Sequence, residues 1–203
     1  MKELIRKLSR MIVRRFYPFY LDVKKEWEGR PLKRLKDSGG QIRYGDGLSV
    51  GGPEYISIGV GCGFGRGLRL EAICSYNGQS FTPDLRIGNN VTMEDWCHIG
   101  CINSVEIGDG TMIASRVFIT DHFHGNISTD DLQYERPALR PLSSKPVKIG
   151  KNVWIGEGVS IMPGVTLGDN VIVGANAVVT HSFPANSVIA GCPAKLIRII
   201  EQK

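Results

Sequence analysis

The C-terminal half of the chain repeats in units of six residues. From Ile149 it reads IGKNVW IGEGVS IMPGVT LGDNVI VGANAV VTHSFP, and each unit opens with Ile, Leu or Val. An α-helix has 3.6 residues per turn, so it would carry these aliphatic side chains off any one face within two units. Short strands joined by repeated turns keep them in line. The period therefore predicts a coil of short strands and an all-β fold.

Two further blocks follow the same rule, IGNNVT MEDWCH IGCINS from Ile87 and IGVGCG FGRGLR LEAICS from Ile58. We expect the first residue of each unit to point inward and the fifth to fill the corner beside it, while Gly, Asp and Asn supply the turns. In the C-terminal block the fifth residues are Val153, Val159, Val165, Val171, Ala177 and Phe183. Cys62, Cys74 and Cys97 also occupy fifth positions. We therefore predict that they are buried core side chains without a redox or metal-binding role.

The basic character of the chain is confined to its N-terminus. Residues 1–36 carry a net charge of +8 and the remainder −3. Apolar residues recur there at helical spacing, between Lys and Arg at the other positions, which predicts an amphipathic basic helix. The apolar positions are Leu4, Leu8, Met11, Ile12, Phe16 and Phe19. We expect this helix to pack on the body or on another subunit, or to make a peripheral contact with an anionic membrane surface. Nucleic acid is disfavoured, because the body is acidic and no recognition motif follows.

A chain of 203 residues that is 42% hydrophobic can bury one substantial core. We therefore expect a basic helical segment over residues 1–40 and one β-domain over residues 41–200. No apolar run approaches the roughly 18 residues that cross a bilayer, and the first twenty residues lack the cleavage site of a secretory signal. These features favour a cytoplasmic protein. The five cysteines are odd in number and irregularly spaced, which predicts reduced thiols.

Residues 121–145 cannot be threaded as hexads, so this segment is expected to leave the coil as a protruding loop. Such excursions are where repeat proteins carry function. The loop begins with DHFHGN, which contains His122 and His124. A histidine fixed between a rigid coil and a long loop is well placed for acid–base chemistry, because its unperturbed pKa lies near neutrality.

The tandem hexads, the histidine loop and the tail NSVIAGCPAKLIRII resemble the hexapeptide-repeat acyltransferases over about residues 55–200. Within that family the chain looks most like the sugar O-acetyltransferases that modify lipopolysaccharide and capsular polysaccharide. The resemblance implies a left-handed parallel β-helix, a homotrimer with active sites between subunits, acetyl-CoA as co-substrate and no metal. The implied acceptor is a sugar or polysaccharide, and the basic helix suggests one that is found at the inner face of the membrane.

The resemblance also implies roles for the loop residues. His122 matches the base of the family's Thr-x-His motif, and His124 would bind the acceptor or orient the loop, unless the two roles are exchanged. The carboxylate that activates the base is Asp121 or, alternatively, Glu94 or Asp95 from a neighbouring coil.

Coenzyme A would lie along the coils, mostly against backbone groups. The contacts implied by the resemblance are Trp154, Gly156, Glu157, Ala175, Thr180, Lys195 and Arg198. The amide of Glu157 corresponds to the oxyanion donor. Lys195 and Arg198 could meet the nucleotide phosphates or be solvated surface charges. Trp154 could wall the acyl pocket or seal a subunit interface.

Three alternatives remain on the same architecture. A zinc enzyme of the γ-carbonic anhydrase type would use histidines between subunits, but the spaced pair of that family is missing among the four histidines. These are His98, His122, His124 and His181. A purely structural coil would need no loop with paired histidines. An acetyltransferase with a non-sugar acceptor, a hydroxyl or an amine, would keep the mechanism and change only the acceptor.

Overall fold

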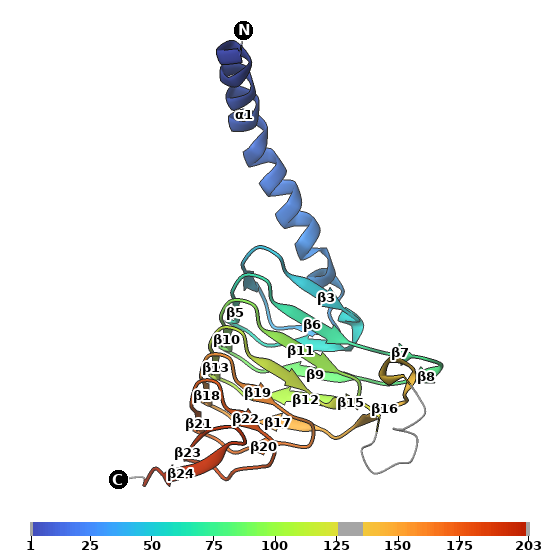
Figure 1. Ribbon diagram of the computed structural model, residues 1–203, viewed down its shortest axis with the longest axis vertical. Coiled ribbons are helices and arrows are strands. Elements are labelled where there is room, and N and C mark those ends of the chain that lie inside the picture. Colours follow the sequence, from blue (N-terminus) through green and yellow to red (C-terminus); the bar gives the residue numbers. More distant parts are fainter. Residues whose placement is uncertain (1, 126–135, 202–203) are drawn as a thin grey trace.

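The computed structural model describes residues 2–125 and 136–201. A long N-terminal helix stands on one end of a coil of triangular section, and the C-terminus lies at the other end (Figure 1). The helix is α1 (Lys2–Gly29), and a 3₁₀ turn, η1 (Arg30–Arg34), joins it to the coil.

Three sheets form the walls of the coil, and we name them sheets A, B and C. Sheet A has the strand order β1 (Asp37–Ser38), β4 (Ile56–Ile58), β9 (Asp84–Ile87), β12 (Ser104–Ile107), β17 (Val147–Ile149) and β20 (Thr166–Leu167). Sheet B has the order β2 (Arg43–Tyr44), β5 (Gly63–Phe64), β10 (Thr92–Met93), β13 (Met112–Ile113), β18 (Trp154–Ile155), β21 (Ile172–Val173), β23 (Ser187–Ala190) and β24 (Lys195–Ile199). Sheet C has the order β22 (Val178–Val179), β19 (Ser160–Ile161), β14 (Phe118–Thr120), β11 (His98–Cys101), β6 (Arg69–Ala72) and β3 (Ser49–Gly51).

The chain visits sheets A, B and C in turn, and neighbouring strands of each wall are parallel except for the last pair, β23 and β24. Three parallel walls of short strands are typical of a left-handed β-helix, so the predicted fold class is confirmed. The coil begins at β1, which already pairs with β4, and therefore starts a few residues before the expected boundary at residue 41.

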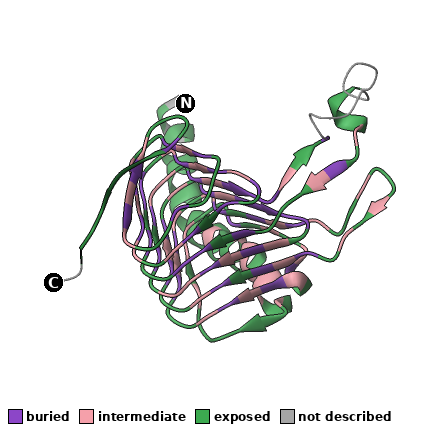
Figure 2. Ribbon diagram, turned by 90° about the horizontal axis from the view of Figure 1, so that it is seen from below, coloured by how far each residue is buried: buried purple, intermediate pink, exposed green. Residues whose placement is uncertain are grey.

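The core runs along the axis of the coil, where buried residues line the inner side of every wall (Figure 2). The first and fifth residues of the C-terminal hexads are all buried there, as predicted. Cys62 and Cys97 are buried in the same way. The prediction for Cys74 is wrong, because the chain leaves the coil at this point and Cys74 is exposed.

Asparagine shapes many of the corners. Asn152, Asn170 and Asn176 have φ values of 53°, 58° and 59°, in the left-handed region that Asn tolerates better than most side chains. The turns that the hexad composition predicts are therefore formed by these residues.

Helix α1 contacts the coil only near its C-terminal end. The Tyr44 hydroxyl donates to the Lys25 carbonyl at 3.0 Å, and the Gly47 amide donates to the Glu28 carboxylate at 3.1 Å. The apolar side chains nearer the N-terminus are exposed, with Phe16 60% and Phe19 69% accessible. The expectation that the helix packs on the body of its own chain is therefore wrong, and the other two alternatives stay open.

Candidate active site

The predicted loop leaves the coil at the corner between sheets C and A. Its first and last parts form a short antiparallel hairpin of β15 (His122–His124) and β16 (Leu142–Ser144), in which His122 lies opposite Ser144. A 3₁₀ turn, η4 (Pro137–Leu139), precedes β16. Residues 126–135 of the predicted loop lie outside the described residues.

A second hairpin of β7 (Ser75–Tyr76) and β8 (Gln79–Ser80) projects from the same corner and supports the loop (Figures 1 and 2). The Tyr76 hydroxyl donates to the Ala138 carbonyl at 2.7 Å. The Leu142 amide donates to the Gln79 side chain at 2.7 Å. This hairpin is not among the elements predicted above, although the interrupted hexad after Cys74 and the Asn-Gly pair at 77–78 are signals for it.

A cavity of about 290 Å³ opens at this corner. Four of its lining residues carry a hydroxyl or an amide group and two are apolar: Ser80, Thr82, Asn103 and Ser144, with Phe81 and Ile102. The loop root is therefore hollowed on one side, and the hollow has both polar and apolar residues in its lining.

Asp121 and His122 form a hydrogen-bonded pair at the root of the loop. The Asp121 side chain is fully buried, and its carboxylate lies 2.9 Å from Nδ1 of His122. The same carboxylate accepts hydrogen bonds from the amides of Ile102 and Asn103, at distances from 2.8 to 3.2 Å. An ionised carboxylate only accepts hydrogen bonds, so the neutral tautomer of His122 that fits this contact has its proton on Nδ1 and its lone pair on Nε2.

The imidazole of His122 lies over Gly100 of sheet C. A methyl group placed on Gly100 would lie 3.1 Å from Cε1 of His122 and 3.9 Å from Nε2. Glycine thus leaves room for the ring, with its Cε1–Nε2 edge against the outer face of β11. Thr120 also holds the ring, because its Oγ1 lies 3.2 Å from Nδ1.

His124 lies two residues further along β15, and its side chain is exposed. Its ring packs edge-on against Tyr76 of the second hairpin, with ring centres 5.3 Å apart. It therefore links the two hairpins, whereas His122 faces the coil.

The structure separates Glu94 and Asp95 from this pair. They lie in the turn between sheets B and C, and the Asp95 carboxylate is bound by the Arg66 guanidinium at 2.6 Å. This ion pair holds the pKa of Asp95 below its usual value. Within one chain the carboxylate that contacts His122 is Asp121, and the alternative assignment to Glu94 or Asp95 is wrong.

A second polar cluster lies on the outer face of sheet C. Nε2 of His98 lies 2.9 Å from the Glu71 carboxylate, which also binds Arg69 at 2.7 Å. Burial alone would raise the pKa of Glu71, but hydrogen bonds from Arg69 and His98 outweigh it and lower the pKa. Burial lowers the pKa of His98, and the bond to Glu71 opposes this shift. From the sequence His98 is expected only as a possible metal ligand, and Glu71 is not predicted as a functional residue.

Most of the residues expected to hold coenzyme A lie on other parts of the coil. Trp154 projects from sheet B and is half exposed, and Glu157 is ion-paired with Arg116 at the corner between sheets B and C. Gly156 and Ala175 lie in turns at that corner, and Thr180 follows β22. Lys195 and Arg198 are exposed on β24.

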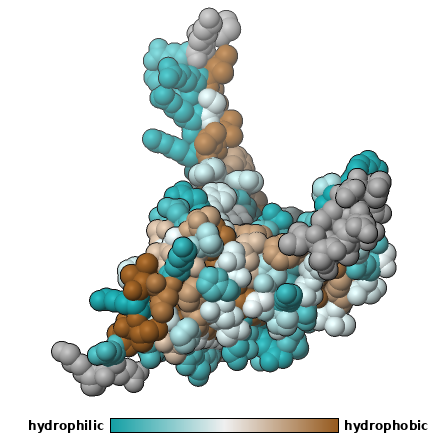
Figure 3. All heavy atoms as spheres, turned by 60° about the horizontal axis from the view of Figure 1, so that its bottom comes forward, coloured by the Kyte–Doolittle hydropathy of each residue, from teal (hydrophilic) through white to brown (hydrophobic). Residues whose placement is uncertain are grey.

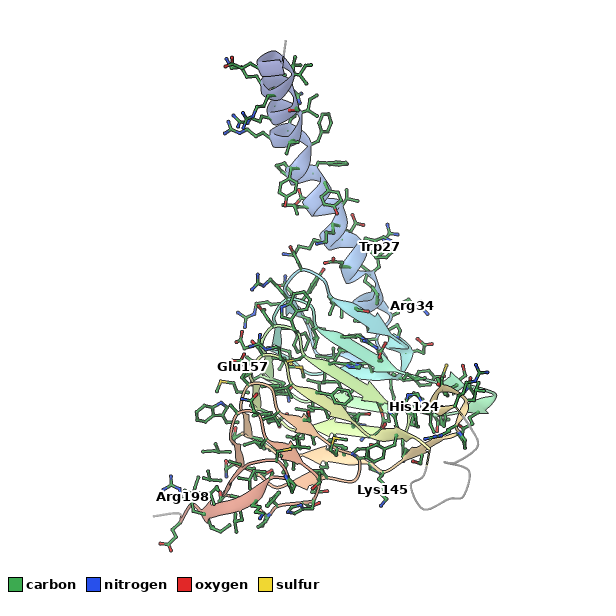
Figure 4. All side chains as sticks on the ribbon, viewed as in Figure 1. Trp27, Arg34, His124, Lys145, Glu157 and Arg198 are labelled. Carbon is green, nitrogen blue, oxygen red and sulfur yellow. The ribbon has the colours of Figure 1, made fainter. Side chains whose placement is uncertain are left out.

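Figure 4 shows Glu157 and Arg198 on one side of the coil and His124 and Lys145 on the opposite side. The structure therefore brings Asp121, His122 and Thr120 together. Within one chain it leaves Trp154, Glu157, Lys195 and Arg198 on or beside sheet B, away from His122, whereas Thr180 lies at the same corner as the loop, two strands further along sheet C.

Among residues 2–125 and 136–201, no group of three or more His, Cys, Asp or Glu side chains is arranged to hold a metal ion. His181 packs against Phe183 near the C-terminal end of the coil. In the part of the chain that the structure describes, no helix is both long and apolar enough to cross a membrane.

The fold and the loop define a left-handed β-helix transferase of the hexapeptide-repeat class. The chain belongs to this family, and residues 146–181 match the family described as bacterial transferase hexapeptide (six repeats). The chain is also 46% identical over 155 residues to the protein WbbJ of Escherichia coli (strain K12), whose name describes it as a lipopolysaccharide biosynthesis O-acetyl transferase. The match covers 72% of this chain and 76% of that protein.

Solved structures show the same architecture. A maltose O-acetyltransferase from Clostridium difficile 630 superposes with a TM-score of 0.57 at 27% identity, covering 97% of this chain and 87% of the other. AntD is an N-acyltransferase from Bacillus cereus that was solved with dTDP and 3-hydroxybutyryl-CoA. It superposes with a TM-score of 0.63 at 19% identity, covering 86% of this chain and 88% of AntD. The second likeness concerns the fold alone.

Proposed function

We propose that this protein is an acetyl-CoA-dependent O-acetyltransferase that acetylates a hydroxyl of a sugar in lipopolysaccharide biosynthesis. The observation that carries the proposal is the buried Asp121 carboxylate on Nδ1 of His122, at the root of a braced loop. The relationship to WbbJ and the likeness to a maltose O-acetyltransferase support a sugar hydroxyl as acceptor.

In the proposed reaction His122 is the general base. Nε2 removes the proton of the acceptor hydroxyl as the oxygen attacks the thioester carbonyl carbon. The bond from that carbon to sulfur then breaks, and the thiolate of coenzyme A receives the proton from Nε2. Asp121 fixes the tautomer and stabilises the imidazolium that forms between the two transfers, as a buried carboxylate does in hydrolase triads.

The donor side of the reaction rests on the coenzyme A residues. The backbone amide of Glu157 would donate to the oxyanion of the tetrahedral intermediate, and preorganised amides of this kind stabilise such charge strongly. Lys195 and Arg198 are assigned to the phosphates of coenzyme A, because charge-assisted hydrogen bonds to phosphate suit both side chains. Trp154 would contact the acyl end.

Because these residues lie away from His122 within one chain, we assign the complete site to a homotrimer in which two subunits contribute to each centre. An apolar column on sheet B supports this assembly. Met112, Trp154, Ile172 and Val188 are register neighbours on its outer face, and both Met112 and Trp154 are about half exposed, at 47% and 50%. Exposed apolar columns of this kind are expected at subunit interfaces.

The N-terminal helix is assigned to an anionic membrane surface at the inner face of the membrane. Its apolar residues, such as Ile12, Phe16 and Phe19, are exposed, and Arg6, Arg10 and Arg14 lie on the other side of the helix. Figure 3 shows hydrophobic and hydrophilic residues on different sides of it. A helix of this type inserts its apolar face while its cations meet anionic headgroups. This would place the enzyme beside a lipid-linked acceptor.

The membrane assignment is tested by sedimentation with vesicles of phosphatidylcholine alone or with phosphatidylglycerol added. Binding that requires phosphatidylglycerol, weakens with salt and is lost in an Arg6→Glu, Arg10→Glu, Arg14→Glu variant is the expected result. Equal sedimentation of parent and variant would contradict it.

The function is tested by thiol release from acetyl-CoA with methyl glycosides of glucose, galactose and mannose as acceptors. We expect acceptor-dependent release and an acetyl ester in the product, and loss of both in His122→Ala. Release with amines only would move the proposal to N-acetylation, and stoichiometric zinc in the purified protein would favour the carbonic anhydrase alternative.

A further inference from the structure

We infer that Glu71 and His98 form an acceptor-recognition subsite beside His122, where they accept hydrogen bonds from a sugar hydroxyl adjacent to the one that is acetylated. The inference rests on the proposed function and deepens it, because it assigns the side chains that choose the acceptor. None of these side chains has a role in the proton transfers described above.

The register of sheet C places the subsite. Strands β6, β11 and β14 are neighbours, and their outward positions form two rows across the wall. One row is Arg69, His98 and Phe118, and the other is Glu71, Gly100 and Thr120. The inward residues between them, Leu70, Ile99 and Ile119, are buried in the core.

The catalytic imidazole occupies the gap in the second row. Because Gly100 has no side chain, the ring of His122 rests there, with Glu71 on the neighbouring strand. The imidazole of His98 is close enough for a charge on His122 to lower its pKa. A sugar whose hydroxyl meets Nε2 of His122 therefore lies over this part of the wall.

The protonation states of the pair suit hydroxyl donors. The pKa of Glu71 is lowered by its hydrogen bonds, so it is an anion near neutral pH. The pKa of His98 is lowered by burial, so its ring is neutral there. Nε2–H of His98 then donates to Glu71, which leaves the lone pair on Nδ1. The pair presents a carboxylate oxygen and a ring nitrogen, and both accept from hydroxyls.

The pair is also accessible and held in place. The side chains of Glu71 and His98 are each 30% exposed, and Arg69 binds the same carboxylate oxygen as His98. Phe118 packs against the His98 ring, with centres 5.2 Å apart. An aromatic ring beside polar acceptors suits a sugar, which has an apolar C–H face and a rim of hydroxyls.

The experiment compares two acceptors in the full-length protein. The first is whichever methyl glycoside the parent acetylates best, and the second is its deoxy analogue that lacks the hydroxyl next to the acetylated one. The parent should prefer the first in kcat/KM by about 10- to 100-fold, the value of a hydrogen bond to a charged group. Glu71→Gln and His98→Ala should remove most of this preference, while the KM for acetyl-CoA stays unchanged.

Glu106→Gln is the matched control, because Glu106 is also an outward carboxylate in an ion pair, with Lys148 at 3.4 Å on sheet A. It should keep the parental preference, and the melting temperature of every variant should stay well above the assay temperature. Equal losses toward both acceptors, or an unchanged preference, would overturn the subsite while leaving the proposed function intact. Failure of the parent to release thiol with any glycoside would instead overturn the proposed function, and the subsite with it.

Discussion

At the scale of single residues the two histidines of the loop have different surroundings. His122 is held between Asp121 and the glycine of sheet C, and His124 packs on Tyr76. A side chain that moves protons needs a fixed tautomer and a free nitrogen, and only His122 combines a buried carboxylate on one nitrogen with a second nitrogen against the coil. This difference in contacts gives different expectations for the two substitutions.

His122→Ala should lower kcat by roughly 10²- to 10⁴-fold, the usual contribution of a positioned general base, while the affinity for coenzyme A stays near the parental value. His124→Ala should act mainly on the KM of the acceptor, because its ring links the two hairpins. Steady-state kinetics measures both effects, after melting temperature and oligomeric state have been matched to the parent. If His124→Ala caused the large loss of turnover instead, the two roles would have to be exchanged.

His98 gives a prediction about pH and stability. Burial holds its pKa below the unperturbed value of about 6.5, so the unfolded chain binds a proton more readily than the folded one. The free energy of unfolding should therefore fall as the pH drops from about 6.5 toward the pKa of the folded state. His98→Gln should flatten this part of the profile, measured by urea denaturation at several pH values. A variant profile parallel to the parent's would contradict the assignment. Glu71 changes the profile only at lower pH: its lowered pKa means that the ionised carboxylate stabilises the fold above about pH 4.3, and this stabilisation is lost as the pH falls further.

At the scale of elements, helix α1 is almost independent of the coil. Its polar contacts with the body come from the last turn, near Lys25 and Glu28. Deleting residues 2–23 should therefore change the melting temperature of the coil by no more than about 2 °C, as for surface changes away from packed features. Turnover with a soluble methyl glycoside should also be unchanged. A large fall in melting temperature, or loss of the oligomer in light scattering, would show that the helix packs on another subunit.

Strand β24 carries the two cations assigned to coenzyme A. Lys195→Ala and Arg198→Ala should each raise the KM for acetyl-CoA by roughly 10- to 100-fold, since a charge-assisted hydrogen bond contributes about 1.5–3 kcal/mol. Turnover at saturation should change less. Lys148→Ala, on sheet A, is the control and should leave the KM unchanged. Equal inhibition of the parent by coenzyme A and by its 3′-dephospho analogue would show that these cations do not contact the ribose phosphate.

The elements also show how far the sequence predicts the structure. A hexad is a local pattern, so the buried first and fifth residues, the walls and the departure of the loop after Thr120 all follow from it. Cys74 shows where this reasoning fails. Its position in the repeat predicts burial, but Cys74 is exposed. The turn at Asn77 and Gly78 lets the chain leave the coil here as the hairpin of β7 and β8.

The contact between Glu71 and His98 could not be predicted from the sequence, for a related reason. The two residues are 27 positions apart, and the intervening hairpin lengthens the coil, so their register cannot be counted in sixes. The contact of Asp121 with His122 is different, because adjacent residues meet only when the backbone turns in a particular way. Here the amides of Ile102 and Asn103 on the preceding coil hold the carboxylate in place.

At the scale of the whole molecule the separation of the two half-sites gives the strongest test of the trimer. His122 lies at the corner between sheets C and A, and Lys195 and Arg198 lie on sheet B. If each centre takes its base from one subunit and its cations from the next, a chain lacking the base and a chain lacking the cations can complete each other. Light scattering of the parent should show a trimer.

The two chains to co-express are His122→Ala and the double variant Lys195→Ala, Arg198→Ala, each nearly inactive alone at low acetyl-CoA. Random mixing in a cyclic trimer leaves about a quarter of the centres with both intact halves, so roughly a quarter of parental activity should return. Mixing the separately purified trimers without exchange of subunits is the control and should restore nothing. If co-expression gave no recovery while mixed trimers were present by mass spectrometry, base and cations would belong to the same subunit, and the shared centre would have to be abandoned.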